Sequence, residues 1–292
     1  MILKIRKNID FMGMRKVTLS LSLVLVVVSL GLLGFKGLNL GIDFTRGNLA
    51  QVEFSHPVGV AEVREVLAEA GQGQAIIQAY SDNGVLIRMS SYDDKAAQEV
   101  LSALRSRFGE VEVLRLEKVG PVAGEQLRQQ AAVALVIALG GILVYITVRF
   151  RFRFAVVSVA ALVHDTVITL GAFSLLGREV SLPFIAAVLT IVGYSLNDTI
   201  VVFDRVRENW KGLRQRGMIT LVNDSINETL SRTVNTSLTT LFPVVTLFLW
   251  GGPVIANFAL ALLIGIVAGT YSSVCIAGAL LGEWYLRSPE KA

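Results

Sequence analysis

Six long runs of apolar residues alternate with short polar segments along the chain. Each run is close to the twenty or so residues that a helix needs to cross a hydrocarbon core. Soluble globular proteins do not contain such runs. The pattern therefore predicts a polytopic α-helical membrane protein with six transmembrane helices. The runs cover residues 17–35, 127–148, 154–176, 182–203, 234–250 and about 255–281.

The segment between the first two runs, residues 37–125, has frequent charges and short periodic stretches. Ser81-Asp82-Asn83-Gly84 separates two apolar stretches and is a strong hairpin-turn signal. The resulting order, βαββαβ, predicts a small ferredoxin-like α+β domain. The expected strands cover 49–54, 74–80, 85–90 and 111–119, and the expected helices cover 61–70 and 94–108.

The chain thus divides into three parts. Residues 1–36 hold the N-terminus and the first helix, which is too long for a signal-peptide core and is expected to be retained. Residues 37–125 form the α+β domain, and residues 126–292 hold helices two to six. Within this last part, residues 205–231 form a basic polar loop. Apolar residues recur there at helical spacing and predict a helix lying on the membrane surface, namely Ile219, Val222, Ile226 and Leu230.

Charge is segregated along the chain, and this predicts an orientation. Lys and Arg gather at the N-terminus, in residues 149–153, in the 205–231 loop and at the C-terminus. Residues 37–124 instead hold eight Lys and Arg against twelve Asp and Glu. The positive-inside rule then places both termini in the cytoplasm and the 37–125 domain outside. In a bacterium with two membranes, this is a multi-pass inner-membrane protein with a periplasmic domain.

Composition narrows the possible functions. The chain is 53% hydrophobic, with a mean hydropathy of +0.61, and its net charge of +4 lies in segments that flank apolar runs, so nucleic-acid binding is not expected. Its one cysteine, Cys275, excludes an intramolecular disulfide and a cysteine-built metal cluster. We find neither metal-ligand spacing nor a phosphate-cradling loop, so no metal, cofactor or enzymatic reaction is expected. An ion gradient is then the expected energy source.

Asp198 is the most costly polar residue in the apolar runs. It lies in the fourth run beside Asn197 and Thr199, where a carboxylate costs roughly 2.5–3.5 kcal/mol. Such residues commonly mark ion or proton paths. The alternative is a polar residue that only holds helices together.

Arg232 stands at the entrance of the fifth run. Thr236, Thr239 and Thr240 follow on the same helical face. Arg232 either marks the interface as a snorkelling side chain or pairs intermittently with Asp198. The guanidinium keeps its charge while the carboxyl can titrate, so such a pair would couple protonation to movement of helices four and five.

His164 and Asp165 form a third ionisable site, in the third run. Neighbouring hydroxyls such as Thr166 and Thr169 could satisfy both side chains. A structural hydrogen-bonding role and a place in a proton path therefore both remain open.

Four stretches of the chain resemble the SecF family, the smaller half of SecDF complexes in the resistance-nodulation-division superfamily. Thr45-Arg46-Gly47 departs from the family, which usually has one residue and two glycines there. The four stretches are Gly41-Ile42-Asp43-Phe44, Val163-His164-Asp165, residues 193–209, and Thr229-Leu230-Ser231-Arg232-Thr233 leading into residues 236–240.

The resemblance implies a function and a set of partners. A SecF subunit pairs with SecD and uses the proton motive force to promote late steps of preprotein translocation. Its expected partners are SecD, the SecYEG translocon, YajC, the preprotein on the outer side and the lipid bilayer. The family's essential membrane Asp and Arg correspond to Asp198 and Arg232, with His164, Asp165, Asn197 and Thr199 as supporting residues. A third family carboxylate belongs to SecD, so one chain carries half of the relay.

Two other functions remain open at this stage. The chain could be a scaffold that conducts no ions and stabilises SecD or the translocon, with Asp198 and Arg232 as a structural ion pair. It could also be a half-size exporter of the same superfamily, although such exporters usually carry twelve helices.

Overall fold

The computed structural model describes residues 8–44, 47–89, 91, 93–119 and 121–288. Thr45 and Arg46, which depart from the family pattern, lie outside these residues. The chain separates into two compact units, a membrane unit of residues 1–39 and 134–292 and a domain of residues 40–133.

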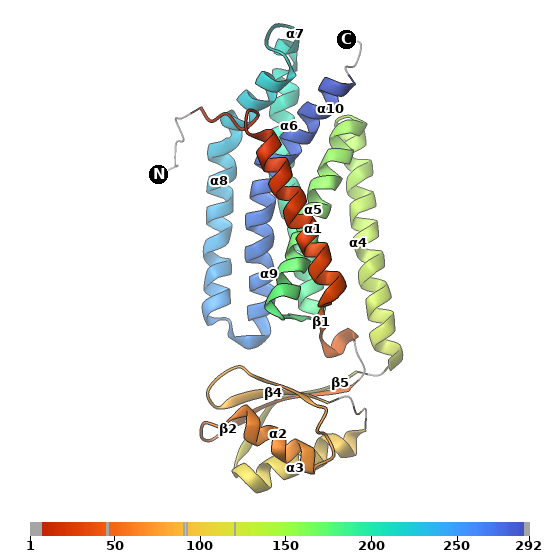
Figure 1. The fold of residues 1–292 in the computed structure, drawn as a ribbon, viewed down its shortest axis with the longest axis vertical. Helices are drawn as coiled ribbons and strands as arrows, with labels where there is room; N and C mark the ends of the chain where they lie inside the picture. Colours follow the sequence, from red (N-terminus) through yellow and green to blue (C-terminus); the bar gives the residue numbers. More distant parts are fainter. Residues whose placement is uncertain (1–7, 45–46, 90, 92, 120, 289–292) are drawn as a thin grey trace. The chain divides into compact units, whose positions relative to one another are not determined.

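The described part of the chain contains six helices that are long and apolar enough to span a membrane, as the sequence predicts. The sixth is interrupted by a π-helical segment, η3 (Ser272–Ala277), and continues as α10 (Gly278–Arg287). The main helices are α1 (Arg15–Phe35), α4 (Pro121–Arg149), α5 (Phe152–Leu176), α6 (Leu182–Glu208), α8 (Met218–Trp250) and α9 (Gly252–Tyr271) (Figure 1).

Residues 218–231 are helical, but the prediction that they form a separate helix on the membrane surface is wrong. The connection consists only of η2 (Asn209–Gly212) and α7 (Leu213–Arg216), and α8 then runs unbroken from Met218 into the fifth span. The apolar residues that suggested a surface helix pack in the protein core, where Val222, Ile226 and Leu230 are buried. Gly278 of α10 makes room for this face, because a Cβ there would lie 2.8 Å from Ile226. The stripe therefore faces protein rather than lipid.

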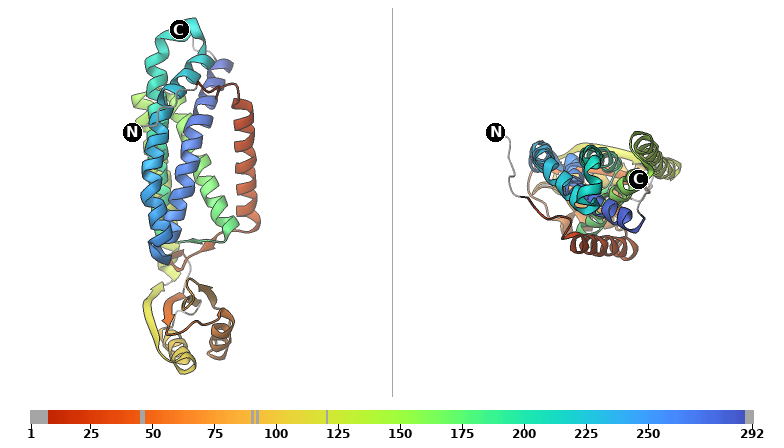
Figure 2. Two further views of the ribbon diagram at one scale, coloured as in Figure 1. Left: turned by 90° about the vertical axis from the view of Figure 1, so that its left-hand side faces the viewer. Right: turned by 90° about the horizontal axis from the view of Figure 1, so that it is seen from above.

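Helix α9 lies at the centre of the membrane unit, against α5, α6 and α8. Two glycines allow its backbone to approach α6 closely, as small residues commonly do in membrane helices. A Cβ on Gly265 would lie 2.3 Å from Ile191, and one on Gly269 would lie 2.8 Å from Ser195. Helix α1 packs on the outside of the unit against α5 (Figure 2). Helix α4 instead leaves many apolar residues exposed, including Val133, Val136, Ile137 and Val144.

The domain confirms the ferredoxin-like prediction. Its antiparallel sheet has the order β3-β4-β2-β5. The predicted turn Ser81-Asp82-Asn83-Gly84 does join β3 to β4. Helices α2 (Val60–Glu69) and α3 (Asp94–Phe108) cover one face of the sheet (Figure 1). The strands are β2 (Gly47–Phe54), β3 (Ile76–Ala79), β4 (Gly84–Met89) and β5 (Val111–Val119).

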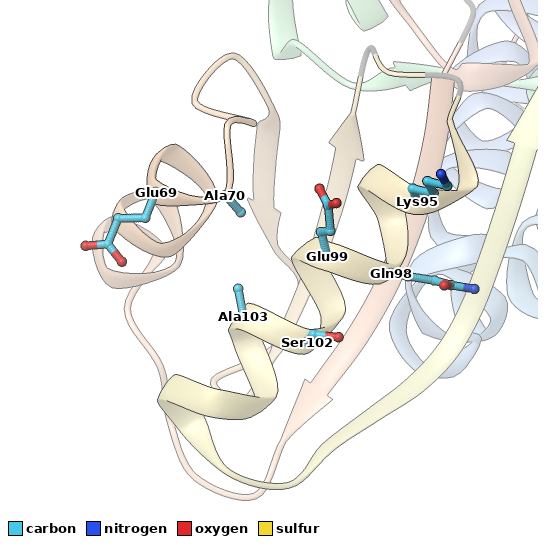
Figure 3. A pocket seen from close by; sticks show the side chains of 7 residues that line it. All are labelled: Glu69, Ala70, Lys95, Gln98, Glu99, Ser102 and Ala103. Carbon is cyan, nitrogen blue, oxygen red and sulfur yellow. The ribbon is translucent and has the colours of Figure 1, made fainter.

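Smaller elements complete the chain. A 3-10 turn, η1 (Ile42–Phe44), precedes β2, and two short strands, β1 (Asn39–Leu40) and β6 (Glu179–Val180), pair with each other. An open groove of about 750 Å³ lies between α2 and α3 of the domain (Figure 3). Its lining is polar and carries both signs of charge, with Glu69, Lys95 and Glu99 among its residues.

Candidate functional site

Asp198 lies on α6 and is 2% exposed, so the sequence correctly places a carboxyl group inside the membrane unit. Its Oδ2 atom has no hydrogen-bond partner among the described residues. Ser237 of α8 lies near the carboxyl group. Ser237 Oγ is also 2.7 Å from Thr270 Oγ1 of α9. The side chains of Asp198, Ser237 and Thr270 thus form a polar group between α6, α8 and α9.

Arg232 lies on the same helix as Ser237, but its side chain is exposed. Within the described residues, Asp198 and Arg232 form no ion pair at contact distance. The hydroxyls of Thr236, Thr239 and Thr240 donate to carbonyl groups of their own helix. The predicted threonine stripe therefore does not reach Asp198. Thr233 and Ser237 lie on a neighbouring face and are buried, and Ser237 is the one that lies near Asp198.

The two neighbours of Asp198 have separate environments. Thr199 is buried, and its hydroxyl lies 2.9 Å from Ser273 Oγ in the π-helical segment. Asn197 is exposed on the outer surface of α6. Sequence proximity therefore groups three residues that the helix turns in different directions.

Asp165 is the centre of a second polar site, where it is completely buried on α5. Its Oδ2 atom accepts hydrogen bonds from Ser195 Oγ of α6 at 2.6 Å and from Ser272 Oγ of η3 at 2.8 Å. Its Oδ1 atom is 2.9 Å from His164 Nδ1. Asp165 thus connects three segments of the membrane unit through one carboxyl group.

The predicted hydroxyl partners of this dyad do not satisfy its carboxylate. Thr166 donates to the carbonyl of Leu162, and Thr169 donates to the carbonyl of Asp165 itself. Three serines contact these groups and were not predicted from the sequence. Ser195 and Ser272 donate to Asp165, and Ser273 contacts Thr199. The only local signal is the serine pair in the middle of the sixth apolar run. The π-helical segment turns both of them inward, and such segments often occur at functional sites.

The two sites differ in their chemistry. The Asp165 carboxyl group has a hydrogen-bonding neighbour at each oxygen, which lowers the cost of burying it. His164 Nε2 is buried without a partner among the described residues. Asp198 has hydroxyl neighbours and a more distant guanidinium, so its charge is compensated less directly. Where the structure describes the chain, no group of three or more potential metal-ligating side chains occurs.

Family profiles match most of the chain. The profile described as "Protein export membrane protein SecD/SecF, C-terminal" matches residues 99–287, and the "SecD/SecF GG Motif" profile matches residues 31–58. The chain belongs to the SecD/SecF family. The sequence-based assignment is therefore confirmed.

Several relatives are similar over nearly their whole length. A protein translocase subunit SecF from Desulfurispirillum indicum is 47% identical, over 94% of this chain and 91% of the relative. The SecF subunit from Vibrio alginolyticus is 45% identical, over 96% and 90% of the two chains.

A longer relative has also been solved. The crystal structure of SecDF from a Thermus species superposes with a TM-score of 0.91 at 43% identity, over 97% of this chain. Its super-membrane-facing form superposes with a TM-score of 0.74. This chain spans 39% of the solved SecDF chain.

Proposed function

We propose that this chain is the SecF subunit of a bacterial protein translocase. It pairs with SecD, works beside SecYEG and YajC, and uses the proton motive force to promote late steps of preprotein translocation. The observation that carries this proposal is Asp198, a buried carboxyl group whose Oδ2 atom has no hydrogen-bond partner in the described part of the chain.

The surroundings of Asp198 favour a change of protonation state during the working cycle. Burial disfavours the charged form of a carboxyl group, and nearby hydroxyl and guanidinium groups favour it. On α8 the groups of these kinds are Ser237 and Arg232. A movement of α6 against α8 would alter this balance, since the two groups that support the charge lie on α8. One charge that crosses about 100 mV supplies about 2.3 kcal/mol, which is enough to bias two conformations of similar energy.

Polar residues on the outer face of the unit support pairing with a second membrane subunit. Three polar side chains are exposed on the membrane-spanning helices. They are Asn197 of α6, and Arg232 and Thr239 of α8. Hydrocarbon would leave the Asn197 amide without partners, whereas a helix of SecD could satisfy it. The SecDF relative from Thermus thermophilus, 43% identical over 94% of this chain, contains this region within one longer protein.

The orientation follows the positive-inside rule. Arg149 is the last residue of α4, Arg151 follows it, Arg153 lies in the first turn of α5, and Arg205 and Arg207 lie in the last turn of α6. These helix ends lie at the end of the unit where both described ends of the chain lie (Figure 1). We place this end in the cytoplasm and the 37–125 domain in the periplasm of an inner-membrane protein.

The test is preprotein export into inverted membrane vesicles under an imposed gradient. The Asp198→Asn variant keeps the size and hydrogen-bonding ability of the side chain but removes the titrating group. We expect it to insert and to copurify with SecD, yet to lose the gradient-stimulated part of export. Glu208→Gln, which removes an exposed carboxylate from the same helix, is the matched control and should export normally.

Parallel vesicles with a pH gradient or a sodium gradient identify the coupling ion, and stimulation by the pH gradient is expected. If Asp198→Asn exports normally under that gradient, the ion-relay role is wrong and the scaffold function is supported instead. Asn197→Leu separates pairing from coupling, because it should weaken copurification with SecD without removing a titrating group.

A further inference from the structure

Arginine and phenylalanine alternate through the turn between α4 and α5, in the sequence Arg149-Phe150-Arg151-Phe152-Arg153-Phe154. The predicted orientation of the chain depends only on the positive charges of this turn. Positive charge alone, however, requires neither arginine nor a fixed side-chain arrangement.

The arginines of this turn are held over aromatic rings. The guanidinium carbon of Arg149 lies 5.2 Å from the centre of the Phe150 ring, and that of Arg207, from α6, lies 5.2 Å from the same ring. Arg151 lies 5.4 Å from the Trp210 ring. These distances are within the range of cation–π attraction. The planar groups are therefore arranged before any ligand binds, which lowers the entropy cost of binding.

Arg153 extends the cluster toward α10. Its guanidinium lies 4.6 Å from the Tyr285 ring and donates to the Ser288 carbonyl at 2.6 Å. Asp204 is shared between Arg207 at 2.7 Å and Arg149 at 3.8 Å. One carboxylate thus serves two guanidinium groups of the cluster.

Exposed apolar side chains lie immediately beside these arginines. Val148 is 82% exposed and Phe152 is 59% exposed. The surface therefore combines guanidinium groups with apolar contacts at the end of two membrane helices, where aromatic residues typically mark the headgroup level.

We propose that this surface, formed by residues 148–153, Arg207 and Trp210, binds the phosphodiester headgroup of an anionic phospholipid. The guanidinium groups of Arg149 and Arg151 donate to the phosphate oxygens, which suit the planar fork of arginine. The acyl chains lie along Val148 and Phe152. An acidic soluble partner would not need these two apolar contacts, so the lipid is the ligand that accounts for both parts of the surface.

The test uses the purified full-length chain in a neutral detergent. Thermal unfolding and native mass spectrometry are followed while phosphatidylglycerol, or phosphatidylcholine with the same acyl chains, is added. Inorganic phosphate is a third arm. We expect phosphatidylglycerol to bind and to raise the unfolding temperature, and the other two probes to have little effect. Equal stabilisation by phosphatidylcholine or by phosphate alone would overturn the proposal.

Two double variants locate the site. Arg149→Gln with Arg151→Gln should weaken phosphatidylglycerol binding about thirtyfold, as expected for two basic charges at an anionic surface. Arg149→Lys with Arg151→Lys keeps the charge, and hence the topology, and should bind several-fold more weakly than the wild type. Arg178→Gln, at the other end of α5, should bind as the wild type does. Unchanged binding by the lysine variant would show attraction by charge alone and reject the arginine site.

Discussion

Ser195 on α6 donates a 2.6 Å hydrogen bond to Asp165 on α5, and both residues are almost completely buried. The bond is charge-assisted when Asp165 is ionised, which makes it stronger than a hydrogen bond between neutral groups. Ser272 shares the same carboxylate oxygen, so α5, α6 and the π-helical segment depend on one side chain.

We predict that Ser195→Ala destabilises the membrane unit. The substitution removes a donor from a buried carboxylate, which typically costs about 1–3 kcal/mol, and thermal unfolding of the purified chain measures the loss. Ser158→Ala on α5 is the control, because the Ser158 hydroxyl is buried without a partner among the described residues. That variant should be neutral or slightly more stable. Equal losses in both variants would contradict the bond's role.

Gly269→Ala should also be destabilising, because the added methyl group meets Ser195 at 2.8 Å. Overpacking of this kind typically costs about 1–3 kcal/mol, and here it would also displace the donor to Asp165. Gly140→Ala, where no atom lies within 4 Å of the new methyl group, serves as the control. The unfolding temperatures of the two variants, compared in the same detergent, check this prediction.

The ferredoxin-like domain should fold by itself as residues 37–125. Its core is formed by both helices and the sheet, so circular dichroism should show one cooperative unfolding transition. Leu104→Ala, at a fully buried position, should cost about 2–5 kcal/mol. Leu114→Ala, at an exposed position, should change stability by about 0.5 kcal/mol or less. A non-cooperative transition in the wild-type domain would argue against an independent core.

Alkaline pH should destabilise the same isolated domain, in part through Tyr80. Burial, followed by the charges of Glu53 and Glu112, raises the pKa of the Tyr80 phenol, while a hydrogen bond with Gln51 opposes this. The folded domain therefore retains the phenolic proton at a pH where the unfolded chain has lost it, so stability falls as the pH rises beyond about 10. Urea unfolding at several pH values should give a shallower decline for Tyr80→Phe than for the wild type.

Protease accessibility should distinguish the two faces of the membrane. From the cytoplasmic face we expect cleavage within residues 209–217, because residues 218–231 are helical and their apolar face is buried. From the outer face we expect a released fragment within residues 37–125. Protection mapping on sealed vesicles of both orientations is the measurement, and the opposite pattern would reverse the proposed topology.

Hydrophobic periodicity predicts most of this fold from the sequence. The six spans and the βαββαβ order follow from the length and periodicity of the apolar stretches, which local secondary structure determines. The start of α8 could not be found in this way. An apolar stripe with a polar opposite face looks the same whether it will meet lipid or protein, and here Val222 and Ile226 meet α10.

The candidate site was predicted only in part for a similar reason. Asp198, Asp165 and His164 stand out because ionisable groups are costly in an apolar run. The serines that contact Asp165 are small and common in membrane helices, so their sequence context does not reveal their partners. For Arg232 the sequence leaves two possibilities open, a snorkelling side chain at the interface and an intermittent pair with Asp198, because the choice depends on helix rotation, which the one-dimensional pattern does not specify.

The π-helical segment holds one residue more than the packing of the sixth span requires. A π turn contains one more residue than an α turn, so deleting one residue from Ser272–Ala277 would allow a regular helix to form. Because the wider turn absorbs the extra residue, the helix beyond the deletion would keep nearly the same facing, and Gly278 and Gly282 would still lie against Ile226 and Met12. The loss would fall on the segment itself: without Ser272 the donor to Asp165 is gone, and without Ser273 the contact with Thr199 is gone. The extra residue therefore serves the buried polar contacts rather than the length of the span.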